Sequence, residues 1–302
     1  MHHVTTIDDT KATTPTQYAA HTKGFRRQVL VSRSEGGSPH MNLSVDHLDE
    51  DGVIAPVLHS FEISLYVFEG TLLVTTQGET HQLGPDHVIA IPIGVAYSIC
   101  TLNGPAKWLQ MQSPAELNDG RRQDTFFTGE PLQGSMPVVP DMRDPRRQST
   151  ARFDGDSMDL RKLAGGSPVN APTVSPSMAT ALLAYSGIGV KMLVDEQLGA
   201  KAHTMFIVDY QPTAIAHPHD HPFEEAYVFV AGEVHALVDG ELMVFHPGDV
   251  LWAGVGADHG FENRGTDLVR WIEVQAPQPP SRHSYRFSRE WEHLANKLGH
   301  TH

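Results

Sequence analysis

The chain contains one cysteine, Cys100, among 302 residues, so it cannot form a disulfide within itself. Nothing in the cysteine usage therefore requires an oxidising compartment. No apolar run reaches the length that crosses a membrane, and the polar residues 1–17 lack the apolar centre of a signal peptide. These absences predict a soluble cytoplasmic protein without a membrane partner.

Basic residues are scarce: 22 Lys and Arg face 36 Asp and Glu, for a formal net charge of -14. Binding to a phosphate backbone needs a basic surface, and the sequence has no helix-turn-helix segment, so a nucleic-acid partner is not expected. The composition, with 40% hydrophobic and 19% charged residues, is typical of a globular protein. The length is sufficient for two domains.

Helical periodicity is also rare. From Phe25 onward, short apolar runs alternate with Gly, Pro and Asp, which is typical of an all-β sandwich or barrel. Residues 288–302 are the exception, because Ser288 can cap a helix, Gly299 can end it, and apolar side chains recur between them at helical spacing. We therefore expect an all-β protein with a short C-terminal helix.

The chain contains an internal repeat. The segment QGETHQLGPDHVIAIPIGVAYSICT at 77–101 aligns without a gap with DGELMVFHPGDVLWAGVGADHGFEN at 239–263. After one inserted residue, KWLQMQSP at 107–114 aligns with RWIEVQAP at 270–277. Two copies of one folding unit in tandem explain this pattern best.

Histidines and one glutamate concentrate in the second copy. His219 and His221 are two positions apart, so they share one face of a strand. Glu225 keeps that parity if the backbone stays extended through Pro222, and His259 can complete the set from a later strand. Three imidazoles and a carboxylate suit Fe, Mn, Zn, Cu or Ni better than Ca or Mg.

The neighbouring residues are interpreted by the same parity. Tyr227 and Phe229 are expected to face the interior and to line a pocket for a small organic molecule. Glu224 is expected to face outward. His217 extends the alternating histidines backwards, but pairing it with His219 would place the glutamate out of step, so it is interpreted as a rim residue.

The two segments resemble a known family. HDHPFEEAYVFVAG at 219–232 is similar to the first motif of the cupin superfamily, and GDVLWAGVGADHGFEN at 248–263 is similar to the second. The sequence departs from the family at Gly254, where proline is usual, and at Thr213, where glycine is frequent. By this resemblance the family's four metal ligands fall on His219, His221, Glu225 and His259.

The first copy lacks this ligand set. Alignment of the repeats places Val57, His59, Ile63 and Tyr97 at the four positions of the ligands. One imidazole beside two apolar residues and a phenol is a poor site for these metals, so His59 is interpreted as a structural residue and the first barrel as packed.

The resemblance implies two jelly-roll barrels in tandem, a bicupin. The predicted organisation is a flexible N-terminal arm at 1–24, a metal-free N-terminal cupin at 25–114, an inter-barrel linker with extra elements at 115–185, a C-terminal cupin with the metal site at 186–287, and a helix or tail at 288–302.

Family resemblance leaves several functions open. With Fe or Mn as the one metal per chain, it implies a dioxygenase acting on a small oxygen-rich substrate. Alternatively, the metal acts as a Lewis acid in a hydrolase, lyase, decarboxylase or isomerase, with Glu225 as a catalytic base. The ureidoglycine aminohydrolases are bicupins of this kind, although their ligands differ. A non-catalytic ligand-binding cupin is the third alternative, and a homodimer is implied by resemblance only.

Overall fold

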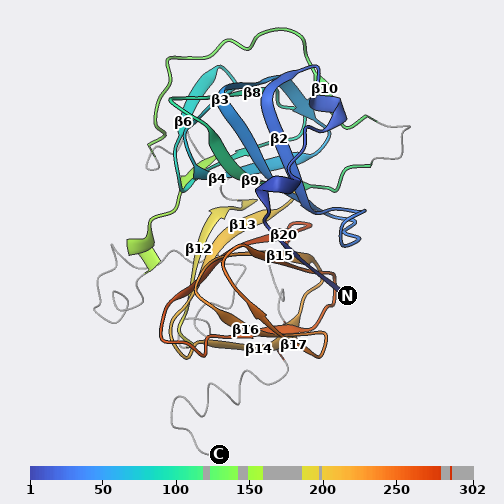
Figure 1. Ribbon diagram of the computed structural model, residues 1–302, viewed down its shortest axis with the longest axis vertical. Coiled ribbons are helices and arrows are strands. Elements are labelled where there is room, and N and C mark those ends of the chain that lie inside the picture. The colour runs from blue at the N-terminus through green and yellow to red at the C-terminus, as the bar shows by residue number, and fades with distance from the viewer. Residues whose placement is uncertain (118–122, 142–148, 159–185, 197–198, 280–285, 288–302) are drawn as a thin grey trace, which may run out of the picture. The chain divides into compact units, whose positions relative to one another are not determined.

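The computed structural model describes residues 1–117, 123–141, 149–158, 186–196, 199–279 and 286–287. The described chain is built almost entirely of β-strands, as predicted (Figure 1). It divides into two compact units. The N-terminal unit comprises Ile7–Phe153 and Leu193–His203, and the C-terminal unit comprises Met1–Thr6, Asp154–Met192 and the chain from Thr204 onward.

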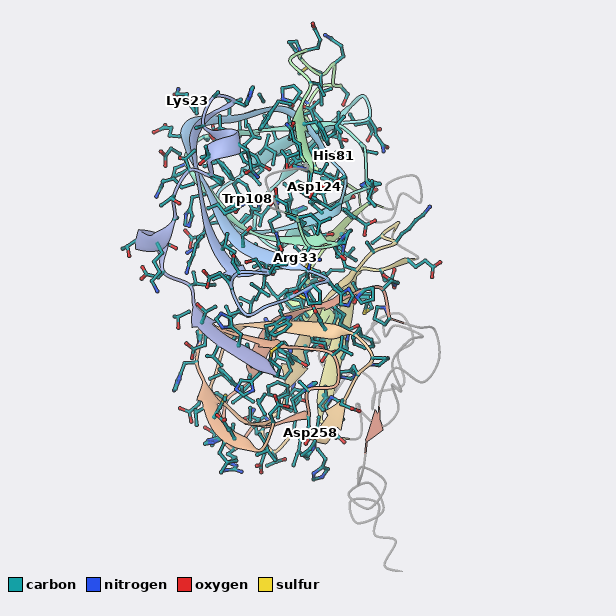
Figure 2. All side chains as sticks on the ribbon, turned by 90° about the vertical axis from the view of Figure 1, so that its right-hand side faces the viewer. Lys23, Arg33, His81, Trp108, Asp124 and Asp258 are labelled. Atoms are coloured by element: carbon teal, nitrogen blue, oxygen red, sulfur yellow. The ribbon has the colours of Figure 1, made fainter. Side chains whose placement is uncertain are left out.

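The N-terminal unit contains one sheet of ten strands with the order β11-β7-β4-β9-β3-β8-β5-β6, while β2 and β10 also pair with β3. Its core is apolar and aromatic, and Trp108 lies fully buried within it (Figure 2). The strands are β2 (Thr22–Val31), β3 (Asn42–His59), β4 (Glu62–Glu69), β5 (Leu72–Thr76), β6 (Glu79–Leu83), β7 (His87–Ile91), β8 (Tyr97–Thr101), β9 (Ala106–Ser113), β10 (Thr125–Phe127) and β11 (Thr150–Arg152).

The C-terminal unit contains a six-stranded sheet, β1-β18-β15-β20-β13-β12, and a five-stranded sheet, β17-β16-β19-β14-β21. Buried residues of both sheets form one core, so the two inner faces pack against each other. The strands are β1 (His2–Thr6), β12 (Ile188–Val194), β13 (Thr204–Tyr210), β14 (Ile215–Asp220), β15 (Glu224–Ala231), β16 (Val234–Val238), β17 (Glu241–Phe245), β18 (Asp249–Ala253), β19 (His259–Glu262), β20 (Val269–Ala276) and β21 (Arg286–Phe287).

The strands confirm the internal repeat. Strands β4 to β8 begin at 62, 72, 79, 87 and 97, and β15 to β19 begin at 224, 234, 241, 249 and 259, a constant offset of 162 residues. Strand β9 corresponds to β20 after one inserted residue, from 106 to 269. The two units are therefore copies of one jelly-roll design, and the prediction of tandem barrels is correct.

Residues 1–24 differ from the predicted flexible arm. His2–Thr6 forms β1, which pairs antiparallel with β18 along its whole length, from His2 opposite Ala253 to Thr6 opposite Asp249. Two short 3-10 helices, η1 (Asp9–Lys11) and η2 (Thr16–Tyr18), follow before β2 begins at Thr22. Polar side chains hid this strand from the sequence analysis, because an edge strand is held by backbone hydrogen bonds that any side chain permits.

The departure at Gly254 has a physical reason in this pairing. The Gly254 N–H donates to the Met1 carbonyl oxygen at 2.9 Å, a bond that proline cannot make. Thr213, the other departure, has φ 69°, a left-handed conformation that favours the glycine frequent at that position. Both departures therefore lie at backbone turns and leave the side-chain cluster unchanged.

The segment expected to be a linker, 115–185, contributes structure to the N-terminal unit. Strand β10 pairs with β3 and β11 pairs with β7, so both extend that sheet. The segment Leu193–His203, expected in the C-terminal cupin, also belongs to the N-terminal unit. The predicted helix at 288–302 lies outside the described residues. In the described part of the chain, no helix is long and apolar enough to cross a membrane.

Candidate metal centre

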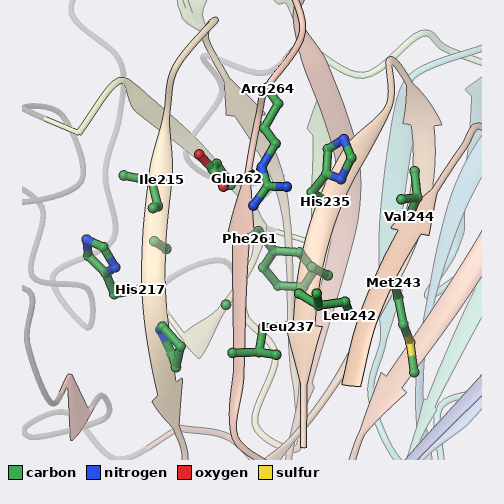
Figure 3. A pocket seen from close by; sticks show the side chains of 14 residues that line it. Ile215, His217, His235, Leu237, Leu242, Met243, Val244, Phe261, Glu262 and Arg264 are labelled. Carbon is green, nitrogen blue, oxygen red and sulfur yellow. Dashed lines mark hydrogen bonds and ion pairs between the residues drawn. The ribbon is translucent and has the colours of Figure 1, made fainter. Parts of the chain in front are cut away.

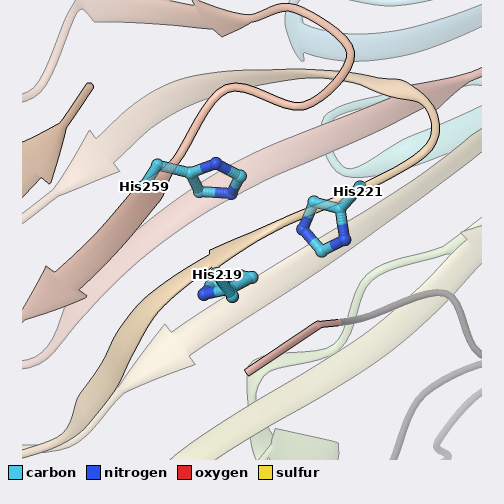
Figure 4. Close-up of side chains that lie close together, drawn as sticks. All are labelled: His219, His221 and His259. Atoms are coloured by element: carbon cyan, nitrogen blue, oxygen red, sulfur yellow. The ribbon is translucent and has the colours of Figure 1, made fainter. Parts of the chain in front are cut away.

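Three histidines gather in the C-terminal unit. One nitrogen each of His219, His221 and His259 lies within 4.8 Å of the other two (Figure 4). His219 is in β14, His221 follows that strand, and His259 begins β19. All three are buried. Within the described ranges, no other group of metal-binding side chains is as close, and these are the histidines that the sequence predicts.

A β-bulge turns His219 toward the interior. Strand β14 pairs with β19 through Ala216 and Phe261, both core residues, and then through His219 and His259, with a shift of register between the two pairs. The shift reverses the side-chain parity, so His219 faces the same side as Ala216 although the two are three positions apart. Gly260 permits this bulge, because a Cβ there would lie 2.8 Å from the Pro218 nitrogen.

Glu225 reaches the histidines from the opposite sheet. The chain leaves β14 after Asp220 and enters β15 at Glu224, in the six-stranded sheet. The condition set for Glu225, an extended backbone through Pro222, is therefore not met, because the chain bends at Pro222 and Phe223. Glu225 nevertheless joins the cluster: its Oε2 lies 3.1 Å from His221 Nε2 and 3.0 Å from His259 Nε2.

Backbone carbonyls orient two of the imidazoles. His219 Nδ1 donates to the His217 oxygen at 2.7 Å, and His259 Nδ1 donates to the Ala257 oxygen at 2.9 Å. These contacts occupy Nδ1 of each ring and leave Nε2 directed toward the cluster. Protein ligands of transition metals are commonly held in this way. The donor set fits a divalent transition metal, with four ligand groups available.

Burial and neighbouring charges shift the pKa values of Glu225 and His219 in the direction that favours binding of a cation. Burial would raise the pKa of Glu225, but the imidazoles of His221 and His259 hold that pKa well below its ordinary value. Burial, with the neighbouring His259 and His221, lowers the pKa of His219 well below its ordinary value. At neutral pH the cluster therefore combines a carboxylate with a neutral imidazole at His219, both in the state that binds metal.

A polar network fixes the carboxylate of Glu225. Gln275 Nε2 donates to Glu225 Oε1 at 2.6 Å, and Thr204 Oγ1 donates to Gln275 Oε1 at 3.0 Å. The threonine thereby determines which way the amide points. With Oε1 held by the amide, Oε2 faces His221 and His259. Gln275 lies in the repeat, but the sequence alone does not indicate its contact with Glu225, which is 50 positions away.

Glu273 extends the network away from the histidines. It accepts from Trp271 Nε1 at 3.0 Å and from Gln275 Nε2 at 3.3 Å. Burial, followed by the charge of Glu225, raises the pKa of Glu273 well above its ordinary value. Glu273 therefore keeps its proton to higher pH than Glu225 does, so Glu225 is the member of this pair that ionises first.

The two predicted pocket residues have different environments. The Tyr227 hydroxyl donates to Glu225 Oε2 and lies 2.7 Å from His259 Nε2, so it touches the cluster directly. The Phe229 ring lies 4.7 Å from Phe245 and 5.8 Å from Trp271, measured between centroids, within the packed core. Tyr227 thus faces the candidate site, whereas Phe229 is surrounded by core side chains.

The side chains of Glu224 and His217 lie away from the cluster. Glu224, expected to face outward, is only 1% exposed, and Trp252 Nε1 lies 3.4 Å from its Oε2. The outward parity was correct, but other residues cover that face of β15. His217 lines a hollow of about 280 Å³ on the outer face of the five-stranded sheet, together with Leu242 and Arg264 (Figure 3).

The equivalent positions of the N-terminal unit are packed. His59 Nε2 lies 2.9 Å from the Tyr97 hydroxyl, and Nδ1 lies 3.0 Å from Thr125 Oγ1. Its ring stacks on Phe61 at 4.4 Å. Burial, with the charge of Arg27, lowers the pKa of His59 to about 3. A neutral, hydrogen-bonded histidine here fits the structural role predicted for it.

The fold and the cluster define a β protein of two barrels with a His/Glu cluster in one of them. Comparisons with known proteins agree with this description. The sequence profile described as Cupin domain matches residues 206–275, which contain all four cluster residues. No curated protein matches the sequence. Residues 206–275 are therefore similar to a cupin domain, and the fold of two tandem jelly-roll units is that of a bicupin.

Solved structures show the same two-barrel fold at low identity. Oxalate decarboxylase from Bacillus subtilis at pH 4.6 has a TM-score of 0.62 and 16% identity, over 98% of this chain and 82% of that chain. A salicylate 1,2-dioxygenase from Pseudaminobacter salicylatoxidans has a TM-score of 0.59 and 11% identity, over 80% of this chain and 72% of that chain. At these identities the likeness concerns the fold.

Proposed function

We propose that the protein is a metal-dependent enzyme that binds one divalent metal per chain, Fe or Mn, in its C-terminal barrel. The observation that carries this proposal is the convergence of three buried imidazoles and one ionised carboxylate from both sheets. His219, His221, Glu225 and His259 would hold the metal. The substrate class is a small organic molecule that binds through oxygen atoms, since such metals accept oxygen ligands.

A bound Fe or Mn would act as a Lewis acid toward the oxygen atoms of the substrate and, in an oxidoreductase, would exchange electrons with it. The protein supplies orientation and a dry setting. Gln275 keeps Glu225 turned toward the histidines, and the buried aromatic side chains exclude water. The Tyr227 hydroxyl can hold or release a proton between Glu225 Oε2 and His259 Nε2.

Among the candidate reactions, we propose dioxygenation of the substrate as the leading one. Both oxygens of Glu225 are already engaged, Oε1 by Gln275 and Oε2 by the imidazoles, which supports a fixed ligand more than a mobile base. The shared fold with a salicylate 1,2-dioxygenase is compatible with this reading.

Lewis-acid chemistry, such as decarboxylation, is the second candidate. The shared fold with oxalate decarboxylase is compatible with it, and the proton on Tyr227 beside the cluster supports it. A non-catalytic ligand-binding protein is the third candidate. A cytoplasmic location and a homodimer remain predictions from the sequence and the family.

The decisive test starts with metal analysis of protein purified anaerobically without added metal. Oxygen uptake and carbon dioxide release are then measured after reconstitution with Fe(II) or Mn(II), across catechol-like, enolisable and dicarboxylate compounds. One metal per chain with substrate-dependent oxygen uptake supports the dioxygenase. Carbon dioxide release without oxygen uptake supports the decarboxylase.

Two variants test where the metal binds. His221→Ala should abolish metal retention while the fold persists, and His59→Ala, its counterpart in the repeat, should leave the metal content unchanged. Folded protein that retains no metal under any condition would refute the proposed enzyme. Metal content near two per chain would refute the single site.

A further inference from the structure

The N-terminal unit retains one polar element of the C-terminal network. Gln112 occupies the register position of Gln275: Gln112 pairs across the sheet with Ile63, as Gln275 pairs with Glu225. Gln275 donates to its glutamate, but Ile63 offers no acceptor. Gln112 is 3% exposed, and its Nε2 has no hydrogen-bond partner among the described residues. A buried donor without an acceptor costs free energy, so this amide requires a partner.

The amide lines a cavity of about 250 Å³. Asn42, opposite Gln112 on β3, lines it too, and within the described chain its buried Oδ1 also lacks a partner. Gln110 and Ser44, both buried, add further polar groups to the wall. All lining residues belong to the N-terminal unit, and His59 is not among them. The cavity is therefore distinct from the packed counterpart of the metal site.

The charges around the cavity oppose an anionic ligand. Arg27 lines it, but its guanidinium donates to both oxygens of Asp46, at 2.7 and 2.6 Å. Glu35 and Glu116 also line it and carry carboxylates. Arg27 is thus paired with Asp46, and the described wall adds two acidic side chains, one of which accepts from Gln17 Nε2, and no second basic one.

We propose that this cavity is a second small-molecule site, which takes a neutral, hydroxyl-rich molecule of about the size of a monosaccharide. Hydroxyl groups both donate and accept hydrogen bonds, so such a molecule suits a wall of amide and hydroxyl side chains that includes Gln112 and Asn42 with their unpartnered atoms. A cavity of about 250 Å³ is smaller than the pockets of drug-sized ligands, which favours a molecule of this size. The site requires no metal and no group of the C-terminal unit.

The test observes the Gln112 side-chain amide directly. In ¹⁵N-labelled full-length protein, the Gln112 amide pair is assigned from its disappearance in Gln112→Leu, which replaces the polar group by an apolar one of similar size. Xylitol and glucose are titrated separately, with sodium acetate as an anionic control. A saturable shift of the Gln112 signals with xylitol or glucose, and none with acetate, is expected.

Variants separate specific binding from general stabilisation by polyols. Binding measured on neighbouring backbone amides should weaken about tenfold or more in Gln112→Leu, since the unpaired group of the ligand is then buried. Gln133→Leu, at an exposed position, should bind as the unmodified protein does. Asn42→Leu serves as the second variant if Gln112→Leu does not fold, and the same loss is expected. No saturable shift with either polyol, or equal shifts in the variants, would overturn the proposal.

Discussion

Gln275 and Glu225 face each other across β20 and β15, and the amide of one donates to the carboxylate of the other at 2.6 Å. The same pair in the first repeat is Gln112 and Ile63. The two units therefore share the glutamine but not the acid. In the C-terminal unit the glutamine orients a candidate ligand, and in the N-terminal unit it faces a cavity. One conserved strand position thus has two environments within one chain.

Replacing Gln275 by leucine should weaken metal binding. Without the amide, Glu225 Oε1 loses its hydrogen bond and the carboxylate can rotate away from His221 and His259. Loss of such an outer contact typically costs ~10–100-fold in metal affinity. Titration with Mn(II), followed by its electron paramagnetic resonance signal, measures the change. Gln112→Leu is the matched control and should bind Mn(II) normally. Equal affinities for both variants would contradict the orienting role.

Replacing Tyr227 by phenylalanine should tighten metal binding. The hydroxyl contacts Glu225 Oε2 and His259 Nε2, the atoms proposed to hold the metal, so it stabilises the metal-free site and competes with the ion. A hydrogen bond of this kind contributes about 1 kcal/mol, so the variant's metal-free form should lose that stability and its Mn(II) affinity should rise about fivefold.

Tyr66→Phe is the control for that variant, because the Tyr66 hydroxyl donates to the Asp86 carboxylate at 2.7 Å in the N-terminal unit. It should leave Mn(II) affinity unchanged. Calorimetric titration measures both variants under one set of conditions. Weaker binding in Tyr227→Phe would show instead that the hydroxyl supports the metal-bound state.

His59 should make the protein sensitive to acid. Its pKa is about 3 in the folded protein, against about 6.5 in an unfolded chain. The unfolded state therefore binds more protons between these values. The contribution of neutral His59 to the unfolding free energy is complete above pH 6.5 and is lost as the pH falls toward 3.

The measurement is urea unfolding of the metal-free protein at pH 7.5 and pH 5. Replacement of His59 by glutamine should reduce the loss of unfolding free energy between these pH values by about 2 kcal/mol. His235→Gln, at a half-buried position in the other unit, provides a control. An identical pH dependence of the His59 variant and the unmodified protein would contradict a neutral His59.

The repeat was predictable because turns between short strands leave a strong pattern in the sequence. Glycines and prolines recur at the same spacing in both copies, and the strands between them begin at the same spacing too. The histidines were predictable because His219 and His221 are two positions apart and because the segments around them and His259 resemble the cupin motifs. Their geometry was not. The bulge before His219 and the turn before Glu225 depend on contacts between strands, which side-chain alternation along one strand does not describe.

Three features could not be predicted from the sequence, because they depend on tertiary contacts. Strand β1 is polar and is held by its backbone. Gln275 aligns with Gln112 of the metal-free copy, so the sequence alone does not separate the two glutamines, and only the residue opposite each one distinguishes their roles. Phe229 has the parity of a pocket residue, but neighbouring aromatic rings fill the space around it.

Replacing Phe229 by alanine therefore tests whether this side chain is part of the hydrophobic core or lines a substrate pocket. The side chain is 1% exposed and stacks on Phe245, so its loss should lower the unfolding free energy by about 3–5 kcal/mol. Mn(II) affinity of the folded variant should stay unchanged, because Phe229 contacts no cluster atom in the described contacts. Leu242→Ala, at a side chain 81% exposed, should change stability by less than ~0.5 kcal/mol. Nearly unchanged stability in Phe229→Ala, with altered substrate binding, would instead make Phe229 a pocket wall.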